Sequence, residues 1–265
     1  MGADGFLVAA SALLGLCLGS FLNVCILRLP NEDPKRRSLM HPPSTCPHCK
    51  QRIAWRDNVP VFSWLWLRGK CRWCRKPISM QYPLIEAIVA LMWVVSVLYY
   101  GFDTKGVSAA VFGTILLGIG VIDARHKVIP DELSLGGLVL GLALSLAGGF
   151  SGLLAAVMGA GVGLGVLWLV RIVGAWVFKQ EAMGMGDVIL LGMIGAFVGW
   201  RNALLTIFFA AILGSAFYLP LMVVKIKQWR RYELPFGVFL AVAAVVTFVF
   251  GDAVISWYAD FLKVH

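Results

Sequence analysis

The sequence has little charge for its length and a surplus of apolar side chains. Charged residues make up 14% of the 265 residues, whereas about 25% is usual in soluble domains. Hydrophobic residues make up 60%, and the mean hydropathy is +0.83. This composition excludes an ordinary soluble domain and predicts an all-α protein that crosses the membrane several times.

Positive charge is missing where a signal peptide would need it. The first apolar run follows Met1-Gly2-Ala3-Asp4, which holds no Lys or Arg, so we expect this run to remain as a first span. Residues 30–82, which come after it, carry eleven Lys and Arg against three acids, and therefore +8 of the net charge of +9. The positive-inside rule places this loop in the cytosol beside anionic phospholipids. A charge confined to one loop beside a span also argues against nucleic-acid binding.

Apolar runs of about 18–25 residues predict eight spans. They cover roughly residues 5–28, 83–101, 107–124, 132–149, 152–178, 187–200, 202–224 and 236–260. The loops assigned to the inside hold most of the remaining basic residues, namely Arg125, Lys127, Lys179, Lys225, Lys227, Arg230 and Arg231. This asymmetry predicts both termini outside. The predicted organisation is a first helix (1–29), a cytosolic domain (30–82) and a transmembrane domain (83–265).

Acidic residues are scarce, and two of the 14 lie at the end of an apolar run. Asp187 follows Gly184-Met185-Gly186 and opens one such run, whereas Asp123 closes another. A charged Asp at a bilayer centre costs roughly 2.5–3.5 kcal/mol, so these positions call for a reason. The predicted topology puts both carboxylates at the cytosolic border, where a pair can act as an aspartyl protease. The alternative is two unrelated acids at helix ends that face water.

Two glycines precede Asp187 in the same stretch. Without Cβ atoms, Gly184 and Gly186 would let another backbone, such as a substrate strand, approach the carboxylate closely. Further on, Pro235-Phe236-Gly237 opens the last span at the same cytosolic level. By itself this is only a helix start that contains proline.

Four of the six cysteines lie in the cytosolic loop, where disulfides are rare. They form Cys46-Pro47-His48-Cys49 and, after 21 residues, Cys71-Arg72-Trp73-Cys74. Paired CxxC knuckles predict a structural zinc site with Cys46, Cys49, Cys71 and Cys74 as ligands. His48 could replace one thiolate. Two redox-active pairs are a further alternative, although no thioredoxin-like βαβ pattern surrounds them.

Taken in order, these motifs resemble the type IV prepilin peptidases, also called leader peptidase/N-methyltransferases. The similarity extends over nearly the whole chain. Its motifs are Gly19–Val24, Arg28-Leu29-Pro30, Pro42-Pro43-Ser44, both CxxC pairs, Asn58-Val59-Pro60, Ser63-Trp64-Leu65, Ile78-Ser79, Tyr82–Glu86, Asp123, Ile129-Pro130-Asp131, Gly184–Asp187 and Pro235-Phe236-Gly237.

The resemblance implies a multi-pass enzyme of the bacterial inner membrane that serves type IV pilus assembly or type II secretion. It would cut the leader from prepilins or pseudopilins after a glycine, on the cytosolic side. It would then methylate the new N-terminus, with S-adenosylmethionine as the methyl donor. Asp123 and Asp187 would be catalytic, and the cysteine tetrad would lie in the region associated with methyl transfer. Substrate-positioning roles would fall to Gly184, Gly186, Pro235 and Gly237.

Two positions depart from the family pattern. Ile189 stands where the family commonly has Lys, and Val238 stands where it commonly has Pro after Pro-Phe-Gly. Neither change removes a catalytic carboxylate. The first removes a cation that would help to hold Asp187 ionised.

Two carboxylates that share a site cannot both ionise easily, so one is expected to keep a proton. Asp187 begins a helix and Asp123 ends one, so the helix dipoles favour Asp187 as the ionised base and Asp123 as the protonated acid. Two other functions stay open. One is a peptidase without methyl transfer, because no G-x-G-x-x-G loop marks a cofactor site. The other is a transporter whose aspartates relay protons or bind a cation, although no internal repeat supports it.

Overall fold

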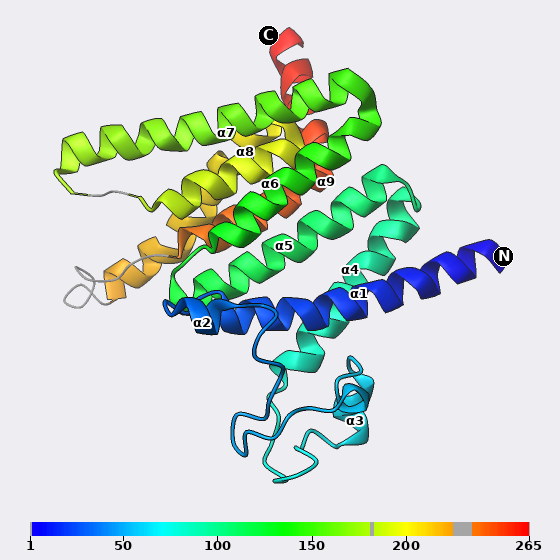
Figure 1. The fold of residues 1–265 in the computed structure, drawn as a ribbon. Coiled ribbons are helices and arrows are strands. Elements are labelled where there is room, and N and C mark those ends of the chain that lie inside the picture. Colours follow the sequence, from blue (N-terminus) through cyan, green and yellow to red (C-terminus); the bar gives the residue numbers. More distant parts are fainter. Residues whose placement is uncertain (1, 181–182, 225–234, 265) are drawn as a thin grey trace. The chain divides into compact units, whose positions relative to one another are not determined.

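The computed structural model describes residues 2–180, 183–224 and 235–264, most of which are helical (Figure 1). The predicted inside residues Lys225, Lys227, Arg230 and Arg231 lie outside the described residues. By packing, the chain divides into unit 1, Met1–Thr114, and unit 2, Ile115–His265. The boundary falls within α5. The predicted organisation into residues 1–29, 30–82 and 83–265 stays a prediction.

Among the described residues the elements are helices, with one longer irregular module between α1 and α4. They are α1 (Gly2–Arg28), α2 (Pro34–Arg37), η1 (Trp55–Asp57), α3 (Phe62–Trp66), α4 (Gln81–Tyr100), α5 (Thr104–His126), α6 (Asp131–Ser145), η2 (Leu146–Gly148), α7 (Gly149–Phe178), α8 (Met185–Val224) and α9 (Phe236–Val264). The module, residues 30–80, contains α2, η1, α3 and the four loop cysteines. We call it the knuckle module.

Six helical stretches among the described residues are long and apolar enough to cross a membrane. They are Gly5–Arg28, Gln81–Tyr100, Thr104–His126, Asp131–Val177, Met185–Pro220 and Phe236–Lys263. The prediction of an all-α, multi-pass protein is confirmed. The sequence predicted eight spans where the structure has six such stretches, because two of the six contain a break.

Both breaks lie close to span boundaries that the sequence predicted. The first separates α6 from α7 at η2 and Gly149, whose φ is 68°. The second lies within α8 at Gly199, with φ 77° and ψ 169°. Side chains with a Cβ rarely adopt such a conformation, so glycine is the residue that permits the reversal there. Each of these two long stretches therefore consists of two helical segments.

In unit 1, α1 and α4 pack closely through small residues of α1. A Cβ added at Gly15 would lie 2.6 Å from the Ala90 Cα, and one at Gly19 would lie 2.7 Å from the Glu86 Cα. Four residues forward along α1 thus correspond to four residues back along α4, so the two helices run antiparallel. Small residues that allow this approach are typical of helix pairs in membranes.

In unit 2, the first half of α8 is the most buried segment. Leu190, Leu191, Met193 and Ile194 are all 0% exposed, and α6, α7 and α9 each pack against α8 (Figure 1). A Cβ added at Gly195 would overlap the α7 backbone at Gly159, so these helices approach to backbone contact. The helix that carries Asp187 in its first turn is therefore held on several sides.

Candidate functional site

The two predicted catalytic aspartates both belong to unit 2. Asp123 lies in the last turn of α5, and Asp187 lies in the first turn of α8. The Asp123 side chain is buried, with the residue 4% exposed, and Asp187 is half-buried. The two carboxylates interact electrostatically. Packing thus brings together two residues that the sequence placed at the ends of different helices.

The Asp123 carboxylate is held by the start of a third helix. Its Oδ2 accepts a hydrogen bond from the Val238 backbone amide at 3.0 Å, and the Gly237 amide also bonds to the carboxylate. The first amides of a helix have no partner within that helix, so Asp123 caps the N-terminus of α9. The positive end of the α9 dipole favours a carboxylate at this place. The premise that Asp123 meets only the negative end of its own helix is therefore wrong.

Position 237, which lies against this cap, has no room for a side chain larger than that of glycine. A Cβ there would lie 2.8 Å from Asp123 Oδ2 and 2.8 Å from Ile129 Cδ1. Gly237 itself is buried. Its close neighbours therefore include the Asp123 carboxylate, and the substrate-positioning role predicted for Gly237 stays a prediction.

Ile129 contacts the N-terminal turns of both α8 and α9, beside the two aspartates. A Cβ at Gly186 would lie 2.9 Å from the Ile129 Cβ, so Ile129 packs against the first turns of both α8 and α9. Sequence reasoning used Ile129 only as part of a motif and gave it no place in the site. The available sign was an apolar side chain in the short turn between Lys127 and Asp131. The space beside Gly186 is thus occupied by Ile129 of the same chain.

The other predicted site residues are less tightly enclosed. Gly184 is exposed, and a Cβ there would lie 3.6 Å from Asp187 Oδ2, which is ordinary contact. Pro235 is half-buried and directly precedes α9. Asp187 Oδ1 is buried and has no hydrogen-bond partner in the part of the chain that the structure describes.

The four cysteines of the knuckle module lie together in unit 1. Their Sγ atoms all lie within 4.8 Å of one another, with 3.8 Å between Cys46 and Cys74 and 4.0 Å between Cys49 and Cys71. A tetrahedral zinc ion with Zn–S bonds of about 2.3 Å needs sulfurs about 3.8 Å apart. The tetrad therefore fits zinc. Among the described residues, His48 is not part of this cluster.

The two knuckles repeat one backbone arrangement. The Cys46 amide donates to the Gln51 carbonyl and the Cys71 amide donates to the Lys76 carbonyl, each at 2.9 Å. A hydrogen bond from the Cys49 amide lowers the pKa of the Cys46 thiol to about 6. A bond from the Gln51 amide acts in the same direction on Cys49, but burial and the neighbouring thiols outweigh it and raise the pKa of Cys49 to about 11. The Cys46 and Cys49 thiols thus differ in how readily they ionise without a metal.

Comparisons with known proteins cover nearly the whole chain. Residues 13–100 match the bacterial peptidase A24 N-terminal domain, and residues 110–219 match the type IV leader peptidase family. A prepilin leader peptidase/N-methyltransferase from Xanthomonas campestris pv. campestris is 37% identical over 95% of this chain and 94% of its own. Proteins of the same name from Aeromonas salmonicida and Pectobacterium carotovorum subsp. carotovorum are 35% and 40% identical, over 93% and 89% of this chain and 91% and 90% of their own. No solved structure matches the chain.

Proposed function

Because the chain belongs to the type IV leader peptidase family, we propose that it processes type IV prepilins or pseudopilins. It is a membrane aspartyl endopeptidase that removes the leader after a glycine, and it then methylates the new N-terminal amine. The observation that carries the peptidase assignment is the Asp123 and Asp187 pair at adjoining helix ends of unit 2. A pair of carboxylates is the equipment of aspartyl proteases.

The surroundings of the two aspartates support different roles. Asp123 is held by two backbone amides, which stabilise a negative charge and fix the carboxylate in position, so we assign it as the base. Asp187 offers an oxygen without a partner among the described residues, so we assign it as the acid. This reverses the roles that the dipoles of the two helices alone had favoured.

Cleavage then proceeds by a general acid–base route. Asp123 takes a proton from water as the water oxygen attacks the scissile carbonyl carbon, and Asp187 gives its proton to the carbonyl oxygen. The tetrahedral intermediate collapses with breakage of the C–N bond. The leaving amine takes the proton that Asp123 had accepted, and the former carbonyl oxygen returns its proton to Asp187 as the carboxyl product forms. The new amine is the N-terminus that is later methylated.

Methyl transfer is supported by the names of the relatives and by the knuckle module. The A24 N-terminal match, residues 13–100, includes the cysteine tetrad. S-adenosylmethionine would supply the methyl group, and zinc held by Cys46, Cys49, Cys71 and Cys74 would stabilise the fold of the module. A bound structural zinc contributes on the order of 10–16 kcal/mol to folding, which matters for a module with few buried apolar residues.

We place the protein in the bacterial inner membrane with its active site at the cytosolic face. The surplus of basic residues in 30–82 supports this orientation and a contact with anionic phospholipids. The substrate's apolar helix approaches within the bilayer while its basic leader stays in the cytosol. The module's own positive charge repels such a leader, so these basic residues serve topology and lipid contact.

Mass spectrometry of a prepilin that is co-expressed with the protein tests the proposal. A shortened chain that begins after a glycine and carries one extra methyl group is the expected product. Cleavage without the methyl group would reduce the proposal to a peptidase alone. An uncut prepilin would contradict it and favour the transporter alternative.

A further inference from the structure

The knuckle module contains a cavity that the peptidase site does not use. Its volume is about 350 Å³, and it is lined by Arg56, Asp57, Ser63, Trp66, Leu67 and Arg72. This volume lies within the range of about 300–1,000 Å³ that is usual for small-molecule sites. Arg72 belongs to the second CxxC knuckle, so one wall of the cavity is part of the backbone that the zinc ligands shape.

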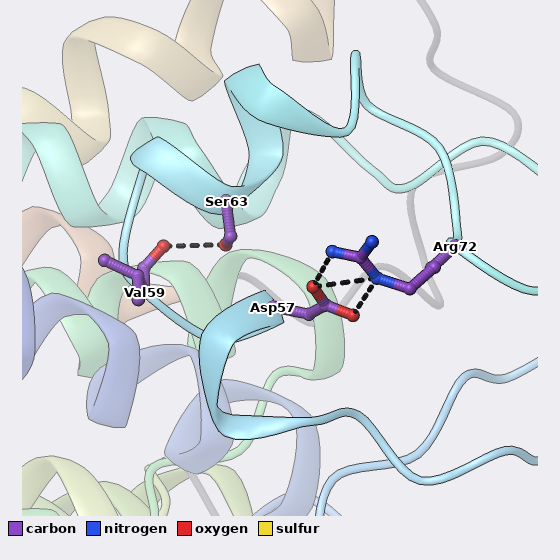
Figure 2. Close-up of polar contacts among 4 residues, drawn as sticks. All are labelled: Asp57, Val59, Ser63 and Arg72. Carbon is purple, nitrogen blue, oxygen red and sulfur yellow. Dashed lines mark hydrogen bonds and ion pairs between the residues drawn. The ribbon is translucent and has the colours of Figure 1, made fainter.

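An ion pair fixes the polar wall of the cavity (Figure 2). Arg72 Nε donates to Asp57 Oδ2 at 2.8 Å and to Oδ1 at 3.1 Å, and Arg72 Nη2 also donates to Oδ1. These bonds hold the pKa of Asp57 below its ordinary value, and the charge of Arg56 acts in the same direction. Two guanidinium groups thus face one carboxylate. The lining carries one net positive charge and suits a ligand with a carboxylate.

The other wall offers an aromatic face and a hydroxyl. Trp66 is 83% exposed although it lines the cavity, so its indole face is available to a planar ring. Ser63 Oγ donates to the Val59 carbonyl at 2.7 Å (Figure 2). Its lone pairs therefore remain as acceptors for a ligand hydroxyl.

A strained turn positions the helix that carries both of these residues. Val61, directly before α3, has φ 60° and ψ −51°, and Phe62 N donates to Pro60 O at 2.6 Å across it. Such a γ-turn is unfavourable for a β-branched residue and needs outside support. Glu86 of α4 provides it, because its Oε2 accepts a bond from the Val61 amide at 2.7 Å. Glu86 is buried, so α3 begins at a fixed point.

We propose that this cavity is the binding site of S-adenosylmethionine, an inference that rests on the proposed methyl transfer. The adenine ring stacks on Trp66, and the methionine carboxylate pairs with Arg56. Asp57 accepts hydrogen bonds from the ribose or the α-amino group. The adenine ring, the carboxylate and the hydroxyl or amino groups thus each meet a side chain of matching chemistry, on a frame held by Glu86 and by the zinc knuckle.

Binding of radiolabelled S-adenosylhomocysteine, the demethylated product, to the purified full chain in detergent tests this site without catalysis. Stacking of a base on an aromatic ring is worth about 1–3 kcal/mol, so Trp66→Ala should weaken binding by roughly 5- to 150-fold. Trp55→Ala is the matched control, since Trp55 is 85% exposed in the same module and does not line the cavity. Zinc content should stay at the wild-type level in both variants, and leader cleavage should do so in Trp55→Ala.

A second variant tests whether weaker binding by Trp66→Ala reflects the lost contact or a local folding defect. Arg56→Ala should also weaken binding, because it removes the cation that pairs with the carboxylate. Equal binding by wild-type, Trp66→Ala and Trp55→Ala proteins would overturn the site and leave the proposed methyl transfer intact. A wild-type protein that neither binds the probe nor methylates a prepilin would remove the methyl transfer itself, and the site with it.

Discussion

The Val238 backbone amide donates a hydrogen bond of 3.0 Å to Asp123 Oδ2, and so joins the end of α5 to the start of α9. In this chain the donor exists because position 238 is not proline, which has no amide hydrogen. The family that the sequence resembles commonly has Pro at this position and Lys where Ile189 stands. Val238 thus supplies a hydrogen bond that proline would not.

Substitution of Val238 tests what this hydrogen bond contributes. Val238→Pro removes the amide within the first turn of α9, where proline is tolerated, while Val238→Ala keeps it. A hydrogen bond to a charged group is worth about 1.5–3 kcal/mol, so Val238→Pro should lower kcat/KM for leader cleavage roughly 10- to 150-fold. Val238→Ala should stay close to wild type. Adding Ile189→Lys should restore part of the loss, and equal activity of the Pro and Ala variants would contradict the account.

The two aspartates should each be indispensable for cleavage. An amide cannot exchange a proton as a carboxyl group does, so Asp123→Asn and Asp187→Asn should each lower leader removal by at least about 100-fold. Processing of a prepilin is followed by gel shift and mass spectrometry, with membrane insertion and zinc content as controls. Near-normal processing by either variant would end the aspartyl assignment.

Glycine at 237 should matter more than glycine at 184. Gly237→Ala pushes a methyl group against Asp123 Oδ2 and Ile129, and a displacement of about 1 Å at a catalytic group can cost roughly 100-fold in rate. Gly184→Ala is the matched control, because its Cβ meets Asp187 Oδ2 at an ordinary 3.6 Å. Equal loss of cleavage in the two variants would contradict this prediction. The glycines would then be required for contact with the substrate and not for the position of Asp123.

The cysteine tetrad should hold one zinc ion per chain. Replacing Cys46 and Cys49 by Ser should remove the metal, as read by elemental analysis of the purified protein. Methyl transfer should fall further than cleavage, because the aspartates lie in the other unit. Equal loss of both activities in a variant that still inserts would count against this separation.

The Asp57 and Arg72 ion pair should make the module's stability depend on pH in a defined direction. The pKa of Asp57 is lower in the folded protein than in the unfolded chain, where it is about 3.9. The stabilisation is therefore complete above that value and is lost as the pH falls through the lower, folded pKa.

Denaturation followed by tryptophan fluorescence, in wild type and Asp57→Asn, gives the measurement. The difference in unfolding free energy should be constant from pH 8 to about 5 and vanish in stronger acid. Acid also releases zinc, but it does so from both proteins, so their difference isolates Asp57. A difference that grows as the pH falls would have the wrong sign.

The sequence by itself determined the class of the protein and the residues to consider. Apolar runs predicted the helices and placed breaks near Gly149 and Gly199, because hydropathy and glycine act over a few neighbouring residues. The CxxC spacing likewise predicted the cysteine tetrad, since each knuckle is a local turn.

Only the tertiary structure decided how the aspartates differ. Asp123 and Val238 are 115 positions apart, so nothing in either local sequence shows that the carboxylate of one helix caps another. Sequence reasoning could assign to Asp123 only the dipole of its own helix, which has the opposite sign. The electrostatic field at a side chain depends on every helix end packed around it, and packing of distant segments sets that field.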